Sequence, residues 1–587
     1  MENKWILRPQ PDEGVVALLR SSLNDLPEPL ARVLALRGIA SYDEAKHFFR
    51  PEMTHLHDPF IMRDMDRAVD RVVEAIQGSE RILVYGDYDV DGTTATSLMV
   101  SFLRSRGLDP VYFIPHRIRD GYGLQPIGID YAANAGAALI IALDCGTTAN
   151  DEAAYAKSRG LDLIICDHHN PEGILPDAVA VLNPKRSDCS YPFDGLSGCG
   201  VGFKLIQGVL SKLGRSGEEA VEYLDLVALS IASDIVPIVD ENRVMMRLGL
   251  DRIRSTPRLG LRALALESGL DLSVCDTGTI AFGIGPRINA AGRLSDARHA
   301  VDLMLTGDDA VAQRLAAELN EINVERRLID TETLERALEI AKSRPGEIGT
   351  NALVIHDASW HVGVIGIVAS RLVEHFYRPV VMLTSVDGEA KGSARSIKGF
   401  NIYNALKDSA DLMTRFGGHE YAAGLTLPEK NIPALRERLD AYASRLLTED
   451  ILKPEIEIDS RLHLSDLTDR FWAVLKQFGP FGPANKRPVF YGSDLIVVGY
   501  PSVVGSGHLK FKVRQSGVPG PGLDVIGFNM HDSLPIVRAT SNPEDHLEMV
   551  FTVDENSWNN RRSLQLKLKD VRKQNGKSDG LGGSVLA

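Results

Sequence analysis

Residues 85–92 read YGDYDVDG, with three aspartates at a period of two and a closing glycine. The pattern D-x-D-x-D-G also opens an EF-hand loop, which needs a glutamate at its twelfth position and a helix before it. The twelfth residue counted from Asp87 is Leu98, and the preceding residues 81–85, RILVY, form a short apolar run typical of a strand. The sequence therefore excludes an EF-hand and predicts acidic residues at the end of a strand.

Short apolar runs alternate with helix-like segments from residue 81 to about 185. Runs such as VYFIP, ALIIALDCG and LDLIICDHH alternate with TTATSLMVSFLRSRG and ANDEAAYAKSRG. Strands that alternate with helices of about 10–15 residues indicate βαβ units and a parallel sheet. Residues 200–255 then read as helices, so the fold class expected here is α/β.

The rest of the chain indicates a second α/β domain and a small all-β module. Residues 309–343 carry an amphipathic pattern without Pro or Gly, which predicts one or two connecting helices. Short strands with Gly/Pro turns follow residue 455 and predict an all-β module. We expect six parts: an N-terminal segment packing on the first domain (1–75), the first α/β domain (76–300), a connecting helix (301–346), the second α/β domain (347–450), the all-β module (455–573) and a disordered tail (574–587).

Length and composition are those of a globular chain of several domains. The 587 residues are 44% hydrophobic and 25% charged. No apolar run approaches the ~18 residues of a membrane span, and the N-terminus lacks the apolar stretch of a signal peptide. Five cysteines form no CxxC pair and are too few for a disulfide framework. We expect a cytoplasmic protein without membrane attachment, and a monomer because its domains can cover one another.

Acidic and histidine residues follow three predicted strands at their carboxyl ends. They are Asp87, Asp89 and Asp91 after the first, Asp144 after the next, and Asp167, His168 and His169 after the third. Because parallel strands share one carboxyl edge, where ligands bind, these groups are expected to converge. A period of two lets Asp89 and Asp91 point the same way. Asp234, in SDIVPI after a helical run, completes the set.

The composition of this cluster indicates a pair of divalent cations. Carboxylates packed closely raise one another's pKa unless cations neutralise them. Oxygen ligands with a minority of imidazole and no thiolate suit Mn²⁺ or Mg²⁺, and two ions ~3.5–4 Å apart would use all of them to hydrolyse a phosphate ester. Alternatively, Asp91 caps a helix, since Gly92 and Thr93 open one. A cap accounts for one aspartate and not for groups at three strand ends.

Two predicted strands of the all-β module have one basic face each. In HLKFKVR, Lys510 and Lys512 alternate with apolar residues, and in LQLKLK, Lys567 and Lys569 alternate with leucines. Basic faces on a small barrel suit an OB-fold that follows the backbone of a single strand. The alternative is an ordinary solvated face. The net charge of −14 argues against nucleic-acid binding over the whole surface, but it does not exclude a local basic channel that binds nucleic acid.

Four motifs resemble those of the DHH phosphoesterase superfamily: YGDYDVDG, ALDCG, CDHH and SDIVP. The stretches FGIGPRINAAGRLSDA, HVGVIGIVASRL, KGSARSI and FGGHEYAAG narrow the resemblance to its bacterial single-strand-specific exonucleases, over nearly the whole chain. The resemblance implies a parallel-sheet DHH domain, a substrate-binding DHHA1 domain and a C-terminal OB-fold. It also implies hydrolysis of single-stranded DNA from the 5′ end to 5′-mononucleotides, in DNA repair and recombination, with two Mn²⁺ or Mg²⁺ ions.

The same resemblance assigns roles to the clustered residues. The metal ligands that it implies are Asp89, Asp91, Asp144, His168 and Asp234. His169 would lie beside the scissile phosphate, and Asp87 would act in catalysis with Asp144 or orient its neighbours. Tyr85 stands where many smaller members of the superfamily have a histidine, which leaves the ligands of the first ion open.

Other residues match the substrate contacts of the family. The resemblance implies that Arg117, Ser393 and Arg395 bind the terminal phosphate. The planar guanidinium group of arginine matches the geometry of a phosphate. For Arg287 and Arg293 the resemblance implies contacts in a DNA channel, and the alternative is salt bridges within the linker. His419 is either a substrate contact or a core histidine.

The expected partner is single-stranded DNA with a 5′ end, and relatives work with a single-strand-binding protein and a helicase. Two other functions stay open: a hydrolase of short oligonucleotides or cyclic dinucleotides, and a non-catalytic DHH scaffold that binds single-stranded DNA. Residues 455–573 argue against the first because small DHH hydrolases lack such a domain. Every acidic position of the four motifs is occupied by an acidic residue, which argues against a non-catalytic scaffold.

Overall fold

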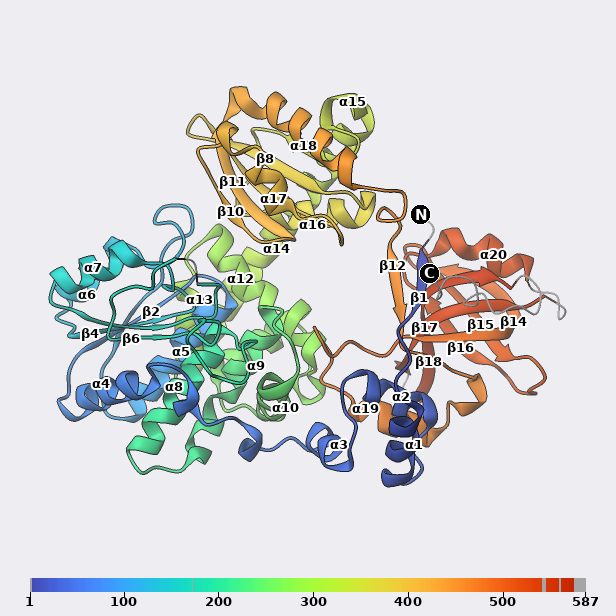
Figure 1. Cartoon of the computed structure of the whole chain (residues 1–587), viewed down its shortest axis with the longest axis horizontal. Coiled ribbons are helices and arrows are strands. Elements are labelled where there is room, and N and C mark those ends of the chain that lie inside the picture. Colours follow the sequence, from blue (N-terminus) through green and yellow to red (C-terminus); the bar gives the residue numbers. More distant parts are fainter. Residues whose placement is uncertain (1–2, 172, 541–544, 559–560, 575–587) are drawn as a thin grey trace. The chain divides into compact units, whose positions relative to one another are not determined.

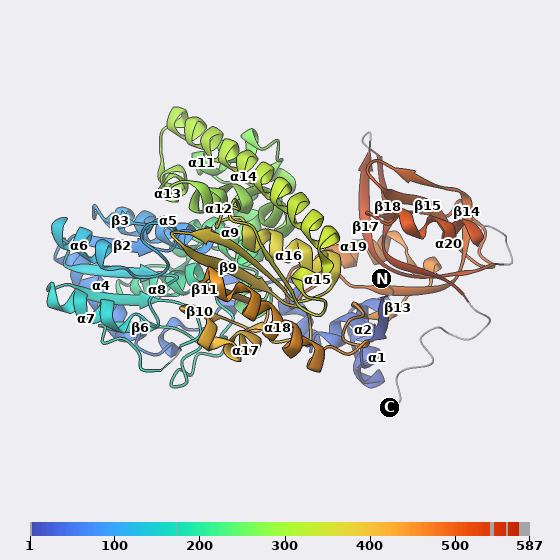
Figure 2. The same ribbon diagram turned by 90° about the horizontal axis from the view of Figure 1, so that it is seen from above.

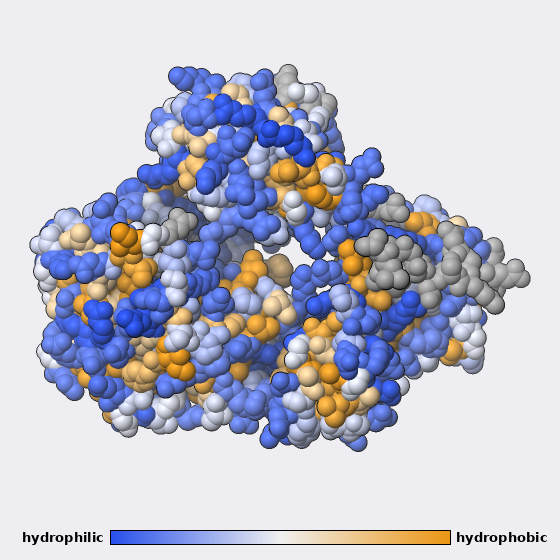
Figure 3. All heavy atoms as spheres, in the orientation of Figure 1, coloured by the Kyte–Doolittle hydropathy of each residue, from blue (hydrophilic) through white to orange (hydrophobic). Residues whose placement is uncertain are grey.

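The computed structural model of the chain describes residues 3–171, 173–540, 545–558 and 561–574 (Figure 1). It divides into two compact units. The larger unit consists of Pro51–Leu452 with Gly482–Ala484, and the smaller unit of Met1–Arg50, Lys453–Phe481 and Asn485–Ala587. Within the described residues, no helix combines the length and apolar composition needed to cross a membrane. Hydrophilic residues cover most of the face in Figure 3.

A five-stranded parallel sheet lies at the centre of the DHH domain. Its strands, in spatial order, are β3 (Val111–Phe113), β2 (Ile82–Gly86), β4 (Leu139–Leu143), β5 (Asp162–Cys166) and β6 (Ala180–Leu182). All four pairings are parallel, as the predicted βαβ units require. The carboxyl ends of all five strands therefore lie at one edge of the sheet.

Helices cover both faces of this sheet, which explains why its strands read as continuous apolar runs. In β4, Leu139 and Ile141 face one core and Ile140 and Ala142 the other. The first core is completed by α4 (Met65–Gln77), α5 (Val90–Ser105), α8 (Gly198–Lys212) and α9 (Leu224–Ser233). The second is completed by α6 (Pro126–Asn134) and α7 (Asn150–Ser158), on the opposite side of the sheet (Figure 1).

A helical region links the DHH domain to the second α/β domain. It contains α10 (Asp240–Arg254), α11 (Leu259–Glu267), the π-helix η5 (Thr279–Ile284), α12 (Gly285–Leu294) and α13 (Arg298–Leu305). The connecting segment is one continuous helix of 35 residues, α14 (Asp309–Ser343), capped by the side chain of Asp308. It packs against α11 and α12, and also against α16 of the next domain (Figure 2).

The DHHA1 domain contains a mixed five-stranded sheet. Its strands, in spatial order, are β10 (Arg415–Gly418), β11 (Ala422–Pro428), β9 (Glu389–Arg395), β8 (Val380–Val386) and β7 (Leu353–His356). Only the pairing of β7 with β8 is parallel among them. The helices α16 (Ile365–Phe376) and α18 (Ile432–Leu446) bury their apolar residues in separate cores with alternate residues of β8.

The all-β module is a closed barrel. Its strands pair in the order β14 (Phe490–Val504), β15 (His508–Gln515), β16 (Leu523–Gly527), β18 (Arg561–Lys573) and β17 (Leu547–Trp558). A further pairing of β14 with β17 closes the sheet on itself. Phe511 of β15 and Leu566 of β18 are among the buried residues that fill it. The closed barrel confirms the predicted OB-fold.

The N-terminal segment differs from the expectation that residues 1–75 pack on the first α/β domain. Strand β1 (Lys4–Leu7) pairs with β12 (Glu455–Ile458) of the smaller unit. The helices α1 (Glu13–Ser22) and α2 (Glu28–Leu36) share one hydrophobic core with the barrel, because their apolar faces, including Leu19 and Leu30, are buried there. Only the part from Pro51 onward belongs to the larger unit.

The predicted disordered tail, 574–587, lies almost wholly outside the described residues. Its first residue, Gln574, donates its backbone N–H to the carbonyl of His546 and is part of the folded barrel.

Candidate metal centre

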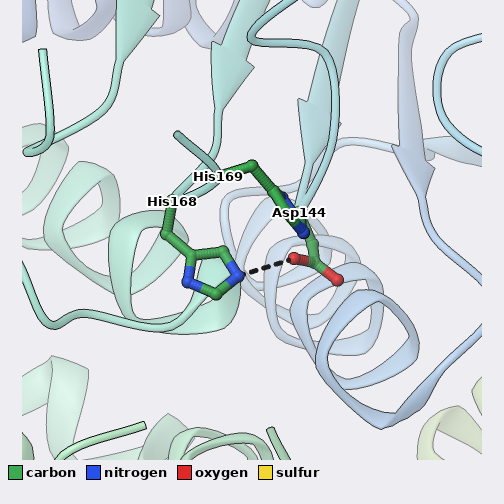
Figure 4. Close-up of side chains that lie close together, drawn as sticks. All are labelled: Asp144, His168 and His169. Carbon is green, nitrogen blue, oxygen red and sulfur yellow. Dashed lines mark ion pairs between the residues drawn. The ribbon is translucent and has the colours of Figure 1, made fainter. Parts of the chain in front are cut away.

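The structure gathers the acidic and histidine residues of the four motifs at the carboxyl edge of the parallel sheet. Asp87 follows β2, Asp144 follows β4, and His168 and His169 follow β5. Asp234 is the C-cap residue of α9. Figure 4 shows Asp144, His168 and His169 side by side.

Three carboxylates surround one ring nitrogen of His168. Its Nε2 atom lies 3.3 Å from Oδ1 of Asp144, 3.5 Å from Oδ2 of Asp234 and 3.7 Å from Oδ2 of Asp91. Oδ1 of Asp144 is buried and has no hydrogen-bond partner among the described residues. Burial lowers the pKa of His168, which favours the neutral imidazole that a metal ion requires.

A second group of oxygen ligands adjoins the first. Ligand atoms of Asp87, Asp89 and Asp144 lie within 4.8 Å of one another. Oδ1 of Asp87 is also buried without a hydrogen-bond partner in the described part of the chain. Asp144 belongs to both groups, so it could serve as a ligand of both ions of a pair.

The protein alone does not balance the charge of this cluster. Burial, and then repulsion from neighbouring carboxylates, raises the pKa of Asp87 and of Asp144 well above the usual range. The same causes raise the pKa of Asp234 to about 9. Divalent cations would neutralise the carboxylates and so offset both effects, and the hard ligands with unpaired buried oxygens fit Mn²⁺ or Mg²⁺.

The aspartates at positions 89 and 91 belong to different candidate ligand groups, and the period of two along a strand from which they were predicted to point the same way is absent. Helix α5 begins at Val90, which places Asp91 in its first turn rather than on a strand with a period of two. The alternative of Asp91 as a helix cap is also wrong. The cap is Asp89, whose side chain accepts a hydrogen bond from the amide of Gly92.

The N-terminus of α8 fixes the carboxylate of Asp91. The amides of Gly198 and Cys199 donate to its two oxygens at 2.7 and 2.8 Å, and Oγ of Ser230 donates at 2.7 Å. A helix N-terminus favours a negative charge. Residue 198 has to be glycine, because a Cβ there would lie 2.6 Å from Cβ of Asp144. The sequence predicted helices from residue 200 but no contact with the acids, since only the tertiary structure makes it.

Two residues orient the imidazole of His169. Its Nδ1 lies 2.7 Å from Oδ1 of Asp167, and its Nε2 lies 3.0 Å from the hydroxyl of Tyr122. Burial lowers the pKa of His169, but the hydrogen bond and charge of Asp167 outweigh it and raise the pKa to about 9. The sequence reasoning missed Tyr122 and the supporting role of Asp167. The only signal was the position of Asp167 within the DHH motif.

Tyr85 takes no part in the metal centre. Its side chain is fully buried beside Phe113 in the core on the α6 side of the sheet, and its hydroxyl donates to the carbonyl of Gly123 at 2.8 Å. The group of Asp87, Asp89 and Asp144 therefore consists of aspartates without a histidine.

Two of the predicted substrate arginines border the metal centre. The guanidinium of Arg117 lies 4.1 Å from the ring centre of Tyr88 and donates to the carbonyl of Gly292 at 3.2 Å. Arg293 donates to the carbonyl of Gly363 at 2.9 Å, and burial followed by repulsion from Arg117 lowers its pKa to about 10. Arginines that repel one another form a site suited to an anion.

Ser393 and Arg395 lie together on β9 of the DHHA1 domain. Nη1 of Arg395 donates to Oγ of Ser393 at 2.9 Å. Both side chains pack against Gly366 in the first turn of α16, where a Cβ would come within 2.9 Å of Oγ of Ser393. The pair is thus held beside a helix N-terminus, which also attracts anions.

The other two predicted contacts of the larger unit lie elsewhere. Arg287 donates to the side chain of Asn320 at 2.9 Å and to the carbonyl of Gly283 at 2.6 Å. It therefore contacts the connecting helix, through neutral hydrogen bonds rather than the salt bridges of the alternative. His419 is exposed in the turn between β10 and β11, which excludes a core histidine.

The barrel has the predicted alternation on β15 and β18, but acids accompany two of its lysines. Lys510, Lys512 and Lys569 are exposed, and Lys567 is half-buried. Lys512 lies 3.7 Å from Asp524, and Lys567 lies 2.5 Å from Asp554. Lys510 and Lys569 make no ion pair with the described residues. The basic face is therefore narrower than the sequence indicated.

Comparison with known proteins assigns each domain. The DHH family, N-terminal domain, matches residues 81–231, the DHHA1 domain matches 349–445, and the RecJ OB domain matches 458–570. The chain is 37% identical over 572 residues to the single-stranded-DNA-specific exonuclease RecJ of Bacillus subtilis, covering 97% of this chain and 70% of that protein. It is 34% identical to the Escherichia coli protein of the same name, over 93% of this chain and 96% of that protein.

A solved structure extends the similarity to three dimensions. The crystal structure of RecJ with Mn²⁺ from Thermus thermophilus matches with a TM-score of 0.82 and 29% identity, over 97% of this chain and 80% of that one. The same protein has been solved with Mg²⁺, and that structure matches with a TM-score of 0.75. The chain belongs to the RecJ family of DHH-domain proteins.

Proposed function

We propose that this chain is a single-stranded-DNA-specific exonuclease that removes 5′-mononucleotides from the 5′ end with two Mn²⁺ or Mg²⁺ ions. The observation that carries the proposal is the pair of ligand groups that share Asp144, with the guanidinium of Arg117 close by. When bound, two ions that share Asp144 as a ligand would activate a water molecule and neutralise the charge of the phosphoryl oxygens.

The side chains around the ions position the reacting phosphodiester. His169, fixed by Asp167 and protonated at neutral pH, would turn its Nε2–H from the hydroxyl of Tyr122 to a non-bridging phosphate oxygen. Arg117, Arg395 and Ser393 would hold the terminal 5′-phosphate, whose two negative charges suit paired guanidinium groups. A grip on the terminus would make the enzyme an exonuclease and set its polarity.

The barrel is proposed to hold the strand beyond the metal centre. Its exposed lysines Lys510 and Lys569 would contact successive phosphates. A substrate held at two places favours long single strands over cyclic dinucleotides and very short oligonucleotides.

The test compares substrates labelled at either end. Purified protein with Mn²⁺ is given single-stranded and duplex DNA, a cyclic dinucleotide and pyrophosphate, and products are resolved over time. Immediate release of labelled mononucleotide from a 5′-labelled single strand supports the proposal. Preferential hydrolysis of the cyclic dinucleotide would support the small-substrate alternative, and binding of DNA without hydrolysis would support a scaffold.

The cellular setting follows from this activity. We propose a monomer that acts in the cytoplasm in DNA repair and recombination, together with a single-strand-binding protein and a helicase that supply free 5′ ends. Sedimentation of the purified chain tests the monomer.

A further inference from the structure

Two large apolar side chains are exposed to solvent on segments that adjoin the metal centre. Phe282 is 85% exposed and Ile235 is 72% exposed. Ile235 directly follows Asp234, the aspartate near His168. Phe282 lies in the π-helix η5, which packs against α9, the helix that ends at Ser233.

A close contact joins the two segments that carry these side chains. A Cβ on Gly285, three residues after Phe282, would lie 2.7 Å from Oγ of Ser233, two residues before Ile235. The two apolar side chains therefore flank one contact at the rim of the metal centre.

The local backbone presents these side chains rather than burying them. In η5, Ile280 and Ile284 are fully buried, which anchors the helix while Phe282 points outward. Insertions of π-helix are frequent at functional sites. Ile235 has a positive φ of 60°, which is an outlier for a β-branched residue. A strained, exposed isoleucine next to a metal ligand indicates a use for its side chain.

Positive charge accompanies the apolar surface. Arg287 donates to the carbonyl of Gly283, next to Phe282, and lies near Arg327 of α14, whose charge, after burial, lowers the pKa of Arg287. An apolar ring beside guanidinium groups matches a single strand, which offers base faces and phosphates in alternation. A protein partner would not need the surface to adjoin the metal centre.

We infer that Phe282, supported by Ile235, forms a stacking platform for a nucleobase of the DNA strand next to the metal centre. This inference rests on the proposed exonuclease function and adds a positioning residue to it. The platform would hold one base in place while the phosphate before it is cut. Arg287 and Arg327 would contact the backbone beside that base.

The test removes the ring and the base separately. Wild type, Phe282→Ala and Phe282→Trp are assayed on 5′-phosphorylated oligonucleotides that carry one abasic residue at successive positions from the 5′ end. In wild type, one abasic position near the 5′ end should lower kcat/KM about tenfold, as expected for the loss of one stacked base. Phe282→Ala should lower kcat/KM about tenfold on the intact strand, chiefly by raising KM. An abasic residue at the sensitive position should not lower the kcat/KM of this variant any further.

Matched variants complete the design. Phe282→Trp keeps a ring and should retain both the activity and the abasic sensitivity of wild type. Val274→Ala removes an apolar side chain that is 69% exposed on a segment packed against α10, and should behave as wild type. Thermal melting shows whether each variant is folded.

The inference is overturned if Phe282→Ala keeps wild-type kcat/KM. It is also overturned if, at every position, an abasic residue lowers the kcat/KM of Phe282→Ala by the same factor as that of wild type. An unaffected folded variant would assign the surface to a protein partner. These results differ from a failure of the proposed function, in which wild type itself leaves single-stranded DNA intact.

Discussion

The Nε2 atom of His168 lies 3.3 Å from Oδ1 of Asp144, although the two residues come from different strands (Figure 4). The register of β4 and β5 places Leu143 opposite Cys166, so the chain leaves both strands at the same level. Strand alignment thus positions these two candidate ligands. Side chains carried on strands and helices are positioned more precisely than side chains on loops.

The first prediction is that Asp144→Asn abolishes hydrolysis and leaves the fold intact. Asp144 has a positive φ of 61°, which asparagine tolerates as well as aspartate. Loss of the bridging carboxylate should lower kcat/KM on the order of a thousandfold, or about 4 kcal/mol. Steady-state assays with Mn²⁺ and a melting curve check this outcome.

The matched control for this variant is Asp130→Asn, which removes an α6 carboxylate that pairs with Arg159. Its activity should stay within about twofold of wild type, because exposed ion pairs contribute little. If Asp144→Asn keeps more than a few per cent of wild-type activity, Asp144 does not bridge the ions.

The second prediction concerns the metal-free protein. The pKa of Asp234 is about 9 in the folded state, against ~4 for an ordinary carboxyl group, so the folded state binds more protons than the unfolded state in between. The free energy of unfolding should therefore fall as the pH rises from about 4 to 9. Melting curves in a chelator should show this fall, and saturating Mn²⁺ should flatten it. A pH-independent melting temperature without metal would contradict the charge cluster.

The variant Asp234→Asn tests the same point without metal. It removes one raised carboxyl group, so the pH dependence in chelator should become shallower and the stability at pH 9 should rise. Asp130→Asn again serves as the control and should keep the slope of wild type.

The third prediction is that the four lysines of the barrel contribute unequally to DNA binding. Replacing Lys510 and Lys569 by Gln should weaken binding to long single strands and lower the log–log salt slope by about 0.7 for each lost contact. Replacing Lys512 and Lys567 should have a smaller effect, because Asp524 and Asp554 already neutralise them in part. Fluorescence anisotropy over a salt series measures the affinity of both double variants for single-stranded DNA. Equal losses on very short oligonucleotides would show that the barrel is not a separate grip.

The fourth prediction concerns the 5′ end of the substrate. Arg395→Ala should reduce the preference for a 5′-phosphate over a 5′-hydroxyl by roughly 10- to 150-fold, the value of a hydrogen bond to a charged group (about 1.5–3 kcal/mol). The variant Arg415→Ala, on the same sheet but exposed on β10, is the control. The ratio of kcat/KM on matched oligonucleotides is measured. An unchanged ratio would show that Arg395 does not bind the terminal phosphate.

Much of the architecture followed from the sequence because its signals are local. The alternation of apolar runs and helices predicted the parallel sheet, and the alternation in HLKFKVR predicted the two faces of a barrel strand. The acids at the strand ends predicted a shared edge. The strand period assumed for Asp89 and Asp91 does not hold, because the chain passes into a helix at Val90 and the period changes there from 2.0 to 3.6.

The fold class and the residue types of the candidate metal centre could be predicted from the sequence, because strand ends and ligand chemistry are properties of short segments. The grouping of the candidate ligands around Asp144, and the contact by which α8 fixes Asp91, come from the tertiary structure. The tertiary structure also decided that Arg287 contacts the connecting helix and that acids pair with two barrel lysines. Such contacts join residues far apart in the chain, and their partners are set by packing rather than by periodicity.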